Sequence, residues 1–176
     1  GLMIRTISRL QHVDPGFRTD GLLSFNLTLP PKVYPDEAVD PFAEQVVTRL
    51  NALPGIKLTA AVSGLYLSGS DYLTFVVEGV HEQDNGDNSI DAQPRSVTPE
   101  FLTTMGIPLL RGRAFTNHDN AQSPNVALIN QRLVRRYFPG QDLIGKRISF
   151  STADGKQVWR EIIGIIGDVR QDSLTS

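Results

Sequence analysis

The sequence contains no cysteine, and aromatic residues make up only 7% of its 176 residues. The lack of cysteine excludes disulfides and thiolate-ligated zinc, although it leaves the cellular compartment open. No run of apolar residues reaches the roughly 18–20 that a membrane-spanning helix requires. Neither sign of charge dominates, because 17 Lys and Arg stand against 19 Asp and Glu, for a net charge of −2. A strong attraction to nucleic acid or to acidic membranes is therefore not expected.

The rest of the composition is that of an ordinary globular chain, with 40% hydrophobic and 20% charged residues. This is enough for one domain or two small lobes. The first ten residues are apolar and basic, but they are too short for a signal peptide and lack a small-residue cleavage site. Residues 169–176 include no further helix or strand pattern. We expect both ends to continue into a longer protein.

Residues 22–64 carry the pattern of a β-α-β unit. Residues 22–29 alternate apolar and polar side chains, which predicts a half-buried strand. Asp40 is the expected N-cap of a helix with Pro41 in its first position, and Pro54–Gly55 is expected to end it. Residues 56–64 predict a second strand. The apolar side chains expected on one face of the first strand and on one stripe of the helix are Leu23, Phe25, Leu27, Leu29, Phe42, Val46, Leu50 and Leu53.

After residue 70, expected strands outnumber helices. Thr98 and Pro99 predict the start of a short helix that ends near residue 106, and Asn130 predicts the N-cap of a helix over 131–138. Asp154–Gly155 predicts a hairpin turn between the last two strands. The expected strands cover 72–80, 90–97 (an edge strand, because of its proline), 107–115, 125–130, 143–150 and 156–169. We predict an α+β fold in two lobes.

Gly140 to Lys146 fits G-x-x-x-x-G-K, which is one residue short of the nucleotide-binding P-loop. A P-loop follows a strand and opens a helix, so that backbone N–H groups hold phosphate. Here a helix precedes the loop, a strand follows it, and Arg147 replaces the Ser or Thr that would hold magnesium. Leu143 and Ile144 place apolar bulk where phosphate would lie. An ATP site is therefore not expected, and Gly140 is interpreted as a helix C-terminal glycine.

Other candidate sites are weak. If Gly86 takes the invariant turn position of an EF-hand loop, Ala92 falls where a bidentate Glu is required, so a solvated acidic loop is the better interpretation. The sequence has no G-x-S-x-G nucleophile motif. Glu78 is interpreted as the outward residue of an alternating strand. The three histidines, which lie far apart in the sequence and suggest no metal site or dyad, are His12, His81 and His118.

Two groups of basic residues remain. One is Arg111–Arg113, and the other lies on the helix expected over 131–138, at Arg132, Arg135 and Arg136. Given the slightly acidic total, a solvated helix face is favoured over contact with nucleic acid. A protein partner with an acidic patch stays open as an intermediate interpretation.

Several phrases, in this order along the chain, together resemble one family. They are LQHVDPGFRTDGLL, RLNALPGIKLTAAVSGLYLSG, VTPEFLTTMGIPLLRGRAFT, NVALINQRLVRRYFPGQDLIGKRI and IIGIIGDVRQDSL. The chain resembles the extracytoplasmic core domain of MacB-type permeases, also called FtsX-like ABC transporter permeases. The resemblance covers nearly the whole chain, and it rests on the ordered set rather than on any single phrase.

The resemblance implies a domain outside the bacterial inner membrane, preceded and followed by transmembrane helices. It also implies a membrane-proximal lobe of two β-α-β units with a second lobe inserted between them. On this basis residues 1–20 would be a juxtamembrane segment, 21–68 the first β-α-β unit and 69–176 the inserted lobe. The second β-α-β unit is missing from the sequence, and we expect this to leave a sheet edge and an apolar face unpaired.

The function that the resemblance implies is mechanical. A cytoplasmic ATPase moves the membrane helices, and the outer domains of a homodimer rock to export a substrate or to signal. A periplasmic adaptor is a further partner that the resemblance implies. No catalytic, cofactor-binding or metal-binding residues are assigned, no cofactor and no nucleic-acid partner are expected, and Asp14–Phe17 and Gly140–Lys146 are given a structural role. The alternative is a stand-alone α+β domain that binds or hydrolyses a small molecule.

Overall fold

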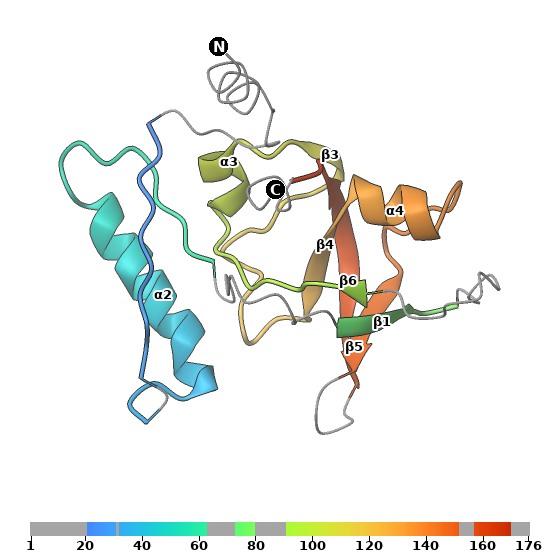
Figure 1. Cartoon of the computed structure of the whole chain (residues 1–176), viewed down its shortest axis with the longest axis horizontal. Coiled ribbons are helices and arrows are strands. Elements are labelled where there is room, and N and C mark those ends of the chain that lie inside the picture. The colour runs from blue at the N-terminus through green and yellow to red at the C-terminus, as the bar shows by residue number, and fades with distance from the viewer. Residues whose placement is uncertain (1–20, 31, 63–72, 80–90, 152–156, 170–176) are drawn as a thin grey trace, which may run out of the picture.

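The computed structural model describes residues 21–30, 32–62, 73–79, 91–151 and 157–169 (Figure 1). Helices are combined with a largely antiparallel sheet, so the predicted α+β class is confirmed. The elements are α2 (Asp36–Asn51), β1 (Leu73–Val77), β2 (Asp91–Ala92), α3 (Phe101–Met105), β3 (Leu109–Gly112), β4 (Val126–Asn130), α4 (Gln131–Tyr137), β5 (Arg147–Ser151) and β6 (Gln157–Ile166). Within the described residues, no helix has the length and hydropathy needed to cross a bilayer.

The sheet is organised around its longest strand, β6. The strand order is β2-β1-β5-β6-β3, and β4 also pairs with β6. The first half of β6 pairs with β5, from Ser151↔Gln157 to Arg147↔Glu161. Its second half pairs with β3 in the antiparallel sense and with β4 in the parallel sense. The predicted hairpin of the last two strands is confirmed, while its turn at Asp154–Gly155 lies outside the described residues.

A pair of glycines allows β3 to pass very close to β6. Gly112 has φ +75° and is the registered partner of Gly164. A Cβ at Gly112 would lie 2.2 Å from the carbonyl oxygen of Ile163, and one at Gly164 would lie 2.6 Å from that of Arg113. Only glycine fits both positions without backbone movement.

The core lies between the sheet and α4. Leu133, Val134 and Tyr137 of α4 pack against it, half-buried. The buried cluster comprises Phe75, Val77, Ile129, Phe138, Leu143, Ile148, Ile162 and Ile165. Burial of each large apolar side chain contributes about 1.5–3 kcal/mol, so this cluster dominates the stability of the sheet.

Helix α2 begins earlier than predicted. It starts at Asp36 with Pro35 as N-cap, so the prediction of Asp40 as N-cap is wrong and Pro41 lies inside the helix. The missing N–H of Pro41 leaves one backbone carbonyl of the preceding turn without its usual partner, which weakens the helix there. The rings of Tyr34 and Phe42 meet edge to face, with centroids 5.0 Å apart, and hold the chain that enters the helix.

The predicted apolar stripe of α2 is only partly buried. Val47, which the prediction omitted, is the buried residue of the helix, with 6% of its surface exposed. Phe42, Val46 and Leu50 are half-buried. Leu53 lies beyond the end of the helix and is exposed.

Within the described residues, the two strands predicted to flank α2 are not formed, and residues 63–64 of the second lie outside them. Residues 22–29 lie outside any strand, and so do residues 56–61. Val62, which follows, forms one isolated bridge with Val97. Apolar and polar side chains alternate along residues 22–29, but the apolar side chains are not buried as in a half-buried strand, since Leu23 is 85% exposed. A strand needs a hydrogen-bonding neighbour, and the described residues supply none beside these segments.

Thr98 does not cap α3, contrary to the prediction. The helix begins at Phe101 with Glu100 as N-cap. The Oγ1 atom of Thr98 instead accepts a hydrogen bond from the backbone N–H of Ala61 at 3.1 Å, and the Thr98 N–H donates to the Ala61 carbonyl at 3.0 Å. Thr98 is buried and joins the segment after α2 to the sheet-forming part of the chain.

The predictions around α4 are largely correct. Asn130 is its N-cap, and its side-chain oxygen accepts a hydrogen bond from the N–H of Leu133 at 3.1 Å. The C-cap is Phe138, so Gly140 is not the terminal glycine of the helix. Gly140 has φ +76° and lies in a turn closed by the hydrogen bond from the Gln141 N–H to the Phe138 carbonyl. Pro139 and Gly140 suit the two central positions of a type II turn.

Candidate interaction surface

Exposed large apolar side chains concentrate in the first described part of the chain. In the sheet-forming part they are Val76, Leu109 and Leu110. Those between residues 23 and 58 are Leu23, Phe25, Leu27, Val33, Leu53, Ile56 and Leu58. Such a concentration is typical of a surface that another part of a protein covers.

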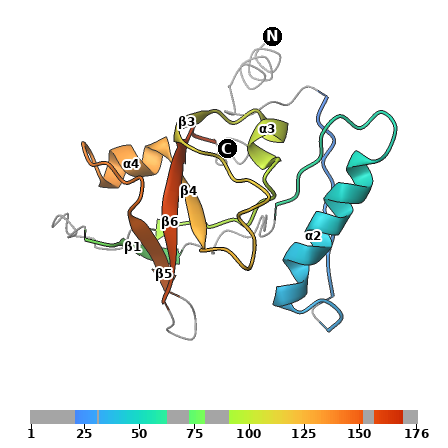
Figure 2. The ribbon, with the colours of Figure 1, turned by 180° about the vertical axis from the view of Figure 1, so that it is seen from behind.

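This apolar surface belongs to a part of the molecule that stands apart from the sheet. Figures 1 and 2 show α2 and residues 21–30 on one side and the sheet with α4 on the other. Among the described residues, the segment 52–62 after α2 meets the sheet-forming part at the bridge Val62↔Val97 and through the two hydrogen bonds between Ala61 and Thr98. Within the described residues, few polar contacts therefore join the part that contains α2 to the sheet.

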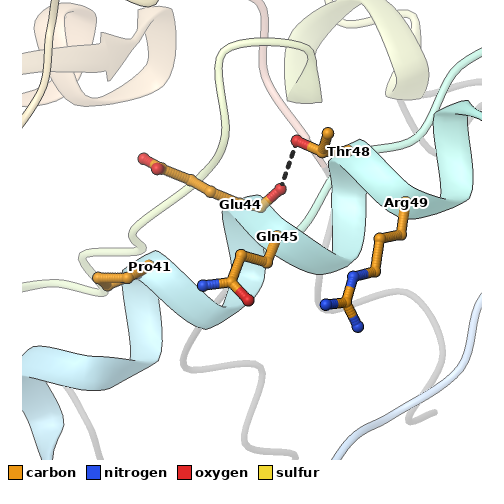
Figure 3. Close-up of a pocket in the computed structure, with 5 residues that line it drawn as sticks. All are labelled: Pro41, Glu44, Gln45, Thr48 and Arg49. Atoms are coloured by element: carbon orange, nitrogen blue, oxygen red, sulfur yellow. Dashed lines mark hydrogen bonds between the residues drawn. The ribbon is translucent and has the colours of Figure 1, made fainter.

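The outer face of α2 carries a shallow cavity of about 350 Å³ (Figure 3). It is lined by Pro41, Glu44, Gln45, Thr48 and Arg49. The hydroxyl of Thr48 already donates to the backbone carbonyl of Glu44 at 2.8 Å. Gln45 and Arg49 point to one side of the helix, and Glu44 and Thr48 to the other (Figure 3). The polar groups do not converge, so this face lacks the geometry of a small-molecule site.

The most constrained polar cluster is built around Asp119. Its carboxylate accepts two hydrogen bonds from the guanidinium of Arg113, both 2.8 Å long. It also accepts from the N–H of Thr116 at 2.8 Å and from the Thr116 hydroxyl at 3.0 Å. Only 8% of the Asp119 side chain is exposed. The cluster fixes the loop between β3 and β4 rather than presenting a reactive group.

These contacts shift the ionisation of both partners. The hydrogen bonds from Arg113, followed by those from Thr116, hold the pKa of Asp119 well below its usual range. The same pairing raises the pKa of Arg113. The sequence pattern did not predict this cluster, because Arg113 stood out only as one of a group of basic residues. The Thr116-x-x-Asp119 spacing, typical of a local side-chain-to-backbone turn, was the available signal.

Gly140–Lys146 lies between α4 and β5, in the predicted order of helix, loop and strand. Leu143 is fully buried in the core, so an apolar side chain lies where a P-loop would hold phosphate. Asp142 accepts a hydrogen bond from the N–H of Ile144 and pairs with Arg111 at 3.0 Å. These contacts, the backbone one first, lower the pKa of Asp142. Asp14–Phe17, the other segment that carries the resemblance, lies outside the described residues.

Glu78 is exposed, as predicted, but it lies one residue beyond the end of β1 and not within the strand. Its carboxylate pairs with Arg147 on β5, whose Nε donates to Oε2 at 2.6 Å. This hydrogen bond lowers the pKa of Glu78. The Arg147 guanidinium also lies over the ring of Trp159, 5.7 Å from its centroid. The ion pair joins the end of β1 to β5 on the surface of the sheet, and it is too open to water to serve as an acid or base.

The histidines do not form a site within the described part of the chain. His118 is exposed, while His12 and His81 lie outside that part. Among the residues that the structure describes, no group of three or more His, Asp or Glu residues is placed to hold a metal ion.

The arginines of α4 form a basic surface. Arg132, Arg135 and Arg136 are exposed, and the Arg136 guanidinium lies 5.1 Å from the centroid of the Tyr137 ring. This surface and the apolar surface between residues 23 and 58 are the features of the molecule best suited to contacts with other proteins.

The fold is that of the extracytoplasmic domains of transporter permeases. The periplasmic region of MacB from Actinobacillus actinomycetemcomitans superposes with a TM-score of 0.51 at 16% identity, covering 73% of this chain and 51% of that one. The extracellular domain of the noncanonic ABC-type transporter YknZ from Gram-positive bacteria gives 0.50 at 18% identity, covering 77% of this chain and 64% of that one. The chain therefore spans about half of one relative and less than two thirds of the other.

The family model of the MacB-like periplasmic core domain matches residues 3–175. The chain belongs to this family, as the ordered phrases of its sequence indicated. No curated protein sequence matches it.

Proposed function

We propose that this domain transmits ATP-driven conformational change across the bacterial inner membrane, as a non-catalytic part of an ABC transporter permease that exports a substrate or signals. The observation that carries the proposal is the family match over residues 3–175. The ATPase activity resides in a cytoplasmic domain or subunit that acts through the membrane helices. In this proposal the permease is a homodimer and meets a periplasmic adaptor.

The division into lobes is part of the same proposal. Residues 21–68 form the first unit of the membrane-proximal lobe, residues 69–176 the inserted lobe, and residues 1–20 the juxtamembrane segment. Two observations support this division: the strands of the sheet all lie between residues 73 and 166, and α2 stands apart from them (Figure 1). The exposed apolar surface between residues 23 and 58 would pack against the second β-α-β unit that the resemblance implies.

The mechanical role can be tested with the intact permease and its ATPase. The 176-residue chain has no cysteine, so Gln122→Cys, in a complex whose cysteines outside this chain are replaced by serine, places one spin label on an exposed loop of each protomer. Pulsed electron resonance then measures the distance between the two labels without nucleotide and with ATP trapped by an ATPase that cannot hydrolyse it. The proposal expects two different distance distributions. Identical distributions in both states would exclude transmission to this domain.

The alternative, a small-molecule-binding or hydrolytic domain, has weaker support. The cavity on α2 lacks converging polar groups (Figure 3). The titratable clusters of the described residues are ion pairs whose hydrogen bonds are already made within the fold.

A further inference from the structure

We propose that the arginine face of α4, formed by Arg132, Arg135 and Arg136, is a docking surface for an acidic surface of a partner protein. The three residues have i, i+3 and i+4 spacing, so they lie together on one face of the helix. All three are exposed. The opposite face, with Leu133, Val134 and Tyr137, packs against the core and fixes the orientation of α4. The inference stands whether the permease exports a substrate or relays a signal.

Within the described residues, the charges of this face do not hold the fold together. Three other arginines of the sheet region each pair with a carboxylate: Arg111 with Asp142, Arg113 with Asp119 and Arg147 with Glu78. In the part of the chain that the structure describes, no carboxylate forms an ion pair with the α4 arginines.

One acidic side chain does contact α4. Asp168, beyond the end of β6, accepts a hydrogen bond from the backbone N–H of Arg132 at 2.6 Å. This carboxylate therefore serves the first turn of the helix, and the guanidinium of Arg132 stays available. The Arg136 guanidinium lies over Tyr137, which orients it without using its N–H groups.

The placement of these arginines is not explained by helix stability. Like charges at i, i+3 and i+4 repel one another, and a cation in the first turn, such as Arg132, opposes the helix dipole. Only Arg135 and Arg136, in the last turn, are favoured by that dipole. A helix of 7 residues has little intrinsic stability to offset this repulsion. A face that weakens its own helix and forms no ion pair within the described residues is better explained by an external contact.

The chemistry of the face selects a protein with carboxylates as the partner. Guanidinium groups bind carboxylates in a bidentate way and are enriched in protein interfaces. A helix that binds a lipid surface inserts its apolar face, whereas the apolar face of α4 is packed against the core. Nucleic acid is disfavoured because the net charge of the chain is −2. An acidic protein surface is the occupant that complements three exposed arginines.

The test uses the 176-residue chain and a helical peptide with glutamates at i, i+3, i+4 and i+7, with a glutamine version of the same peptide as reference. Backbone amide shifts are followed by NMR at about 20 mM and about 300 mM salt. We expect the glutamate peptide, and not its glutamine version, to shift the amides of α4, with weaker binding at the higher salt concentration. The triple variant R132Q/R135Q/R136Q should bind about tenfold more weakly.

A matched variant separates a specific face from net charge. K32Q/R49Q/K57Q removes the same charge from three exposed positions in or near α2, and it should bind the peptide as tightly as the unaltered chain. Equal weakening in both variants, or shifts that map away from α4, would overturn the inference. Tighter binding to vesicles containing phosphatidylglycerol than to the peptide would overturn it in favour of a lipid. Arginine-dependent dimers in sedimentation equilibrium would overturn it in favour of a second copy of this chain. Loss of the amide dispersion in the triple variant of α4 would also overturn it, because it would show that the arginines are needed for folding.

Discussion

Gly112 and Gly164 face each other across the β3–β6 pair, and neither position has room for a Cβ. The obstacles at Gly112 are backbone atoms of Ile163 and Gly164, which cannot rotate away as a side chain can. The approach lets the Arg113 N–H donate to the Ile163 carbonyl at 2.9 Å. Arg113 then leaves the strand in the direction that brings its guanidinium to Asp119. The glycine pair thus connects the sheet to the loop that the hydrogen bonds of Asp119 hold in place.

We predict that Gly164→Ala lowers the free energy of unfolding by about 1–3 kcal/mol, because the added methyl group meets the Arg113 carbonyl and Leu128. Gly112→Ala should cost at least as much, since it adds the roughly 1–2 kcal/mol of a left-handed backbone. Urea unfolding measures both. Gly140→Ala is the matched control, because its φ of +76° is similar and no atom lies within 4 Å of its Cβ position. Equal losses of unfolding free energy at Gly112 and Gly140 would show that β3 and β6 can move apart to accommodate the added methyl group.

Asp119→Asn should destabilise the fold by about 1.5–3 kcal/mol at pH 7, since it removes charge-assisted hydrogen bonds to a nearly buried carboxylate. The pKa of Asp119 is lower in the folded than in the unfolded chain. Its contribution is therefore complete above the unfolded pKa of about 4 and is lost as the pH falls toward the folded pKa.

The measurement is the difference in unfolding free energy between the unaltered chain and Asp119→Asn, followed from pH 7 to pH 3. The difference should stay constant down to about pH 5 and shrink below about pH 4. Asp142→Asn, in an ion pair exposed on both sides, should lose less at pH 7. A difference that does not change with pH would show that the charge of Asp119 is not what stabilises the loop.

Leu143→Ala should cost about 2–5 kcal/mol, because its side chain is fully buried and truncation leaves a cavity beneath the loop before β5. Leu110→Ala is the control, since Leu110 is 43% exposed and the change should stay within about 1 kcal/mol. Thermal or urea unfolding compares the two. A small loss at Leu143 would contradict its assignment to the core and reopen the question of what the Gly140–Lys146 loop encloses.

Thr98→Val keeps the shape of the side chain and removes the acceptor for the Ala61 N–H. We expect a loss of about 1–2 kcal/mol and faster hydrogen exchange at Ala61, because an N–H that is half-buried loses its partner. Thr48→Val, which removes an exposed hydroxyl contact within α2, should change stability by less than about 0.5 kcal/mol. Unchanged exchange at Ala61 would show that the bridge to Val97 holds this N–H without Thr98.

Much of the sheet region could be predicted from the sequence. The pairing of β5 with β6, the cap at Asn130 and the order of helix, loop and strand around Leu143 depend on residues close together in the chain. Local hydrogen bonds and the alternation of apolar side chains suffice to specify such features. The same pattern was insufficient at α2, where the helix starts a full turn before the expected Asp40.

Other features were settled only by contacts between distant residues. Residues 22–29 alternate like a strand, yet they have no hydrogen-bonding neighbour among the described residues and remain unpaired. Thr98 precedes a helix in the sequence as an N-cap would, but its hydroxyl oxygen accepts a hydrogen bond from the N–H of Ala61 instead. The lack of a partner among the described residues decided the first case, and a partner from elsewhere in the chain decided the second.

By itself, the sequence determined the α+β class, the family, the helix α4 with its cap and the hairpin of β5 and β6. The tertiary structure alone decided that β6 pairs with three other strands, that Gly112 meets Gly164, and that Arg113 pairs with Asp119. It also decided that the arginines of α4 form no ion pair with any carboxylate of the described residues. The reason is physical. Periodicity and capping act within a few residues, whereas strand pairing, close backbone approach and ion pairing depend on which distant residues the fold brings into contact.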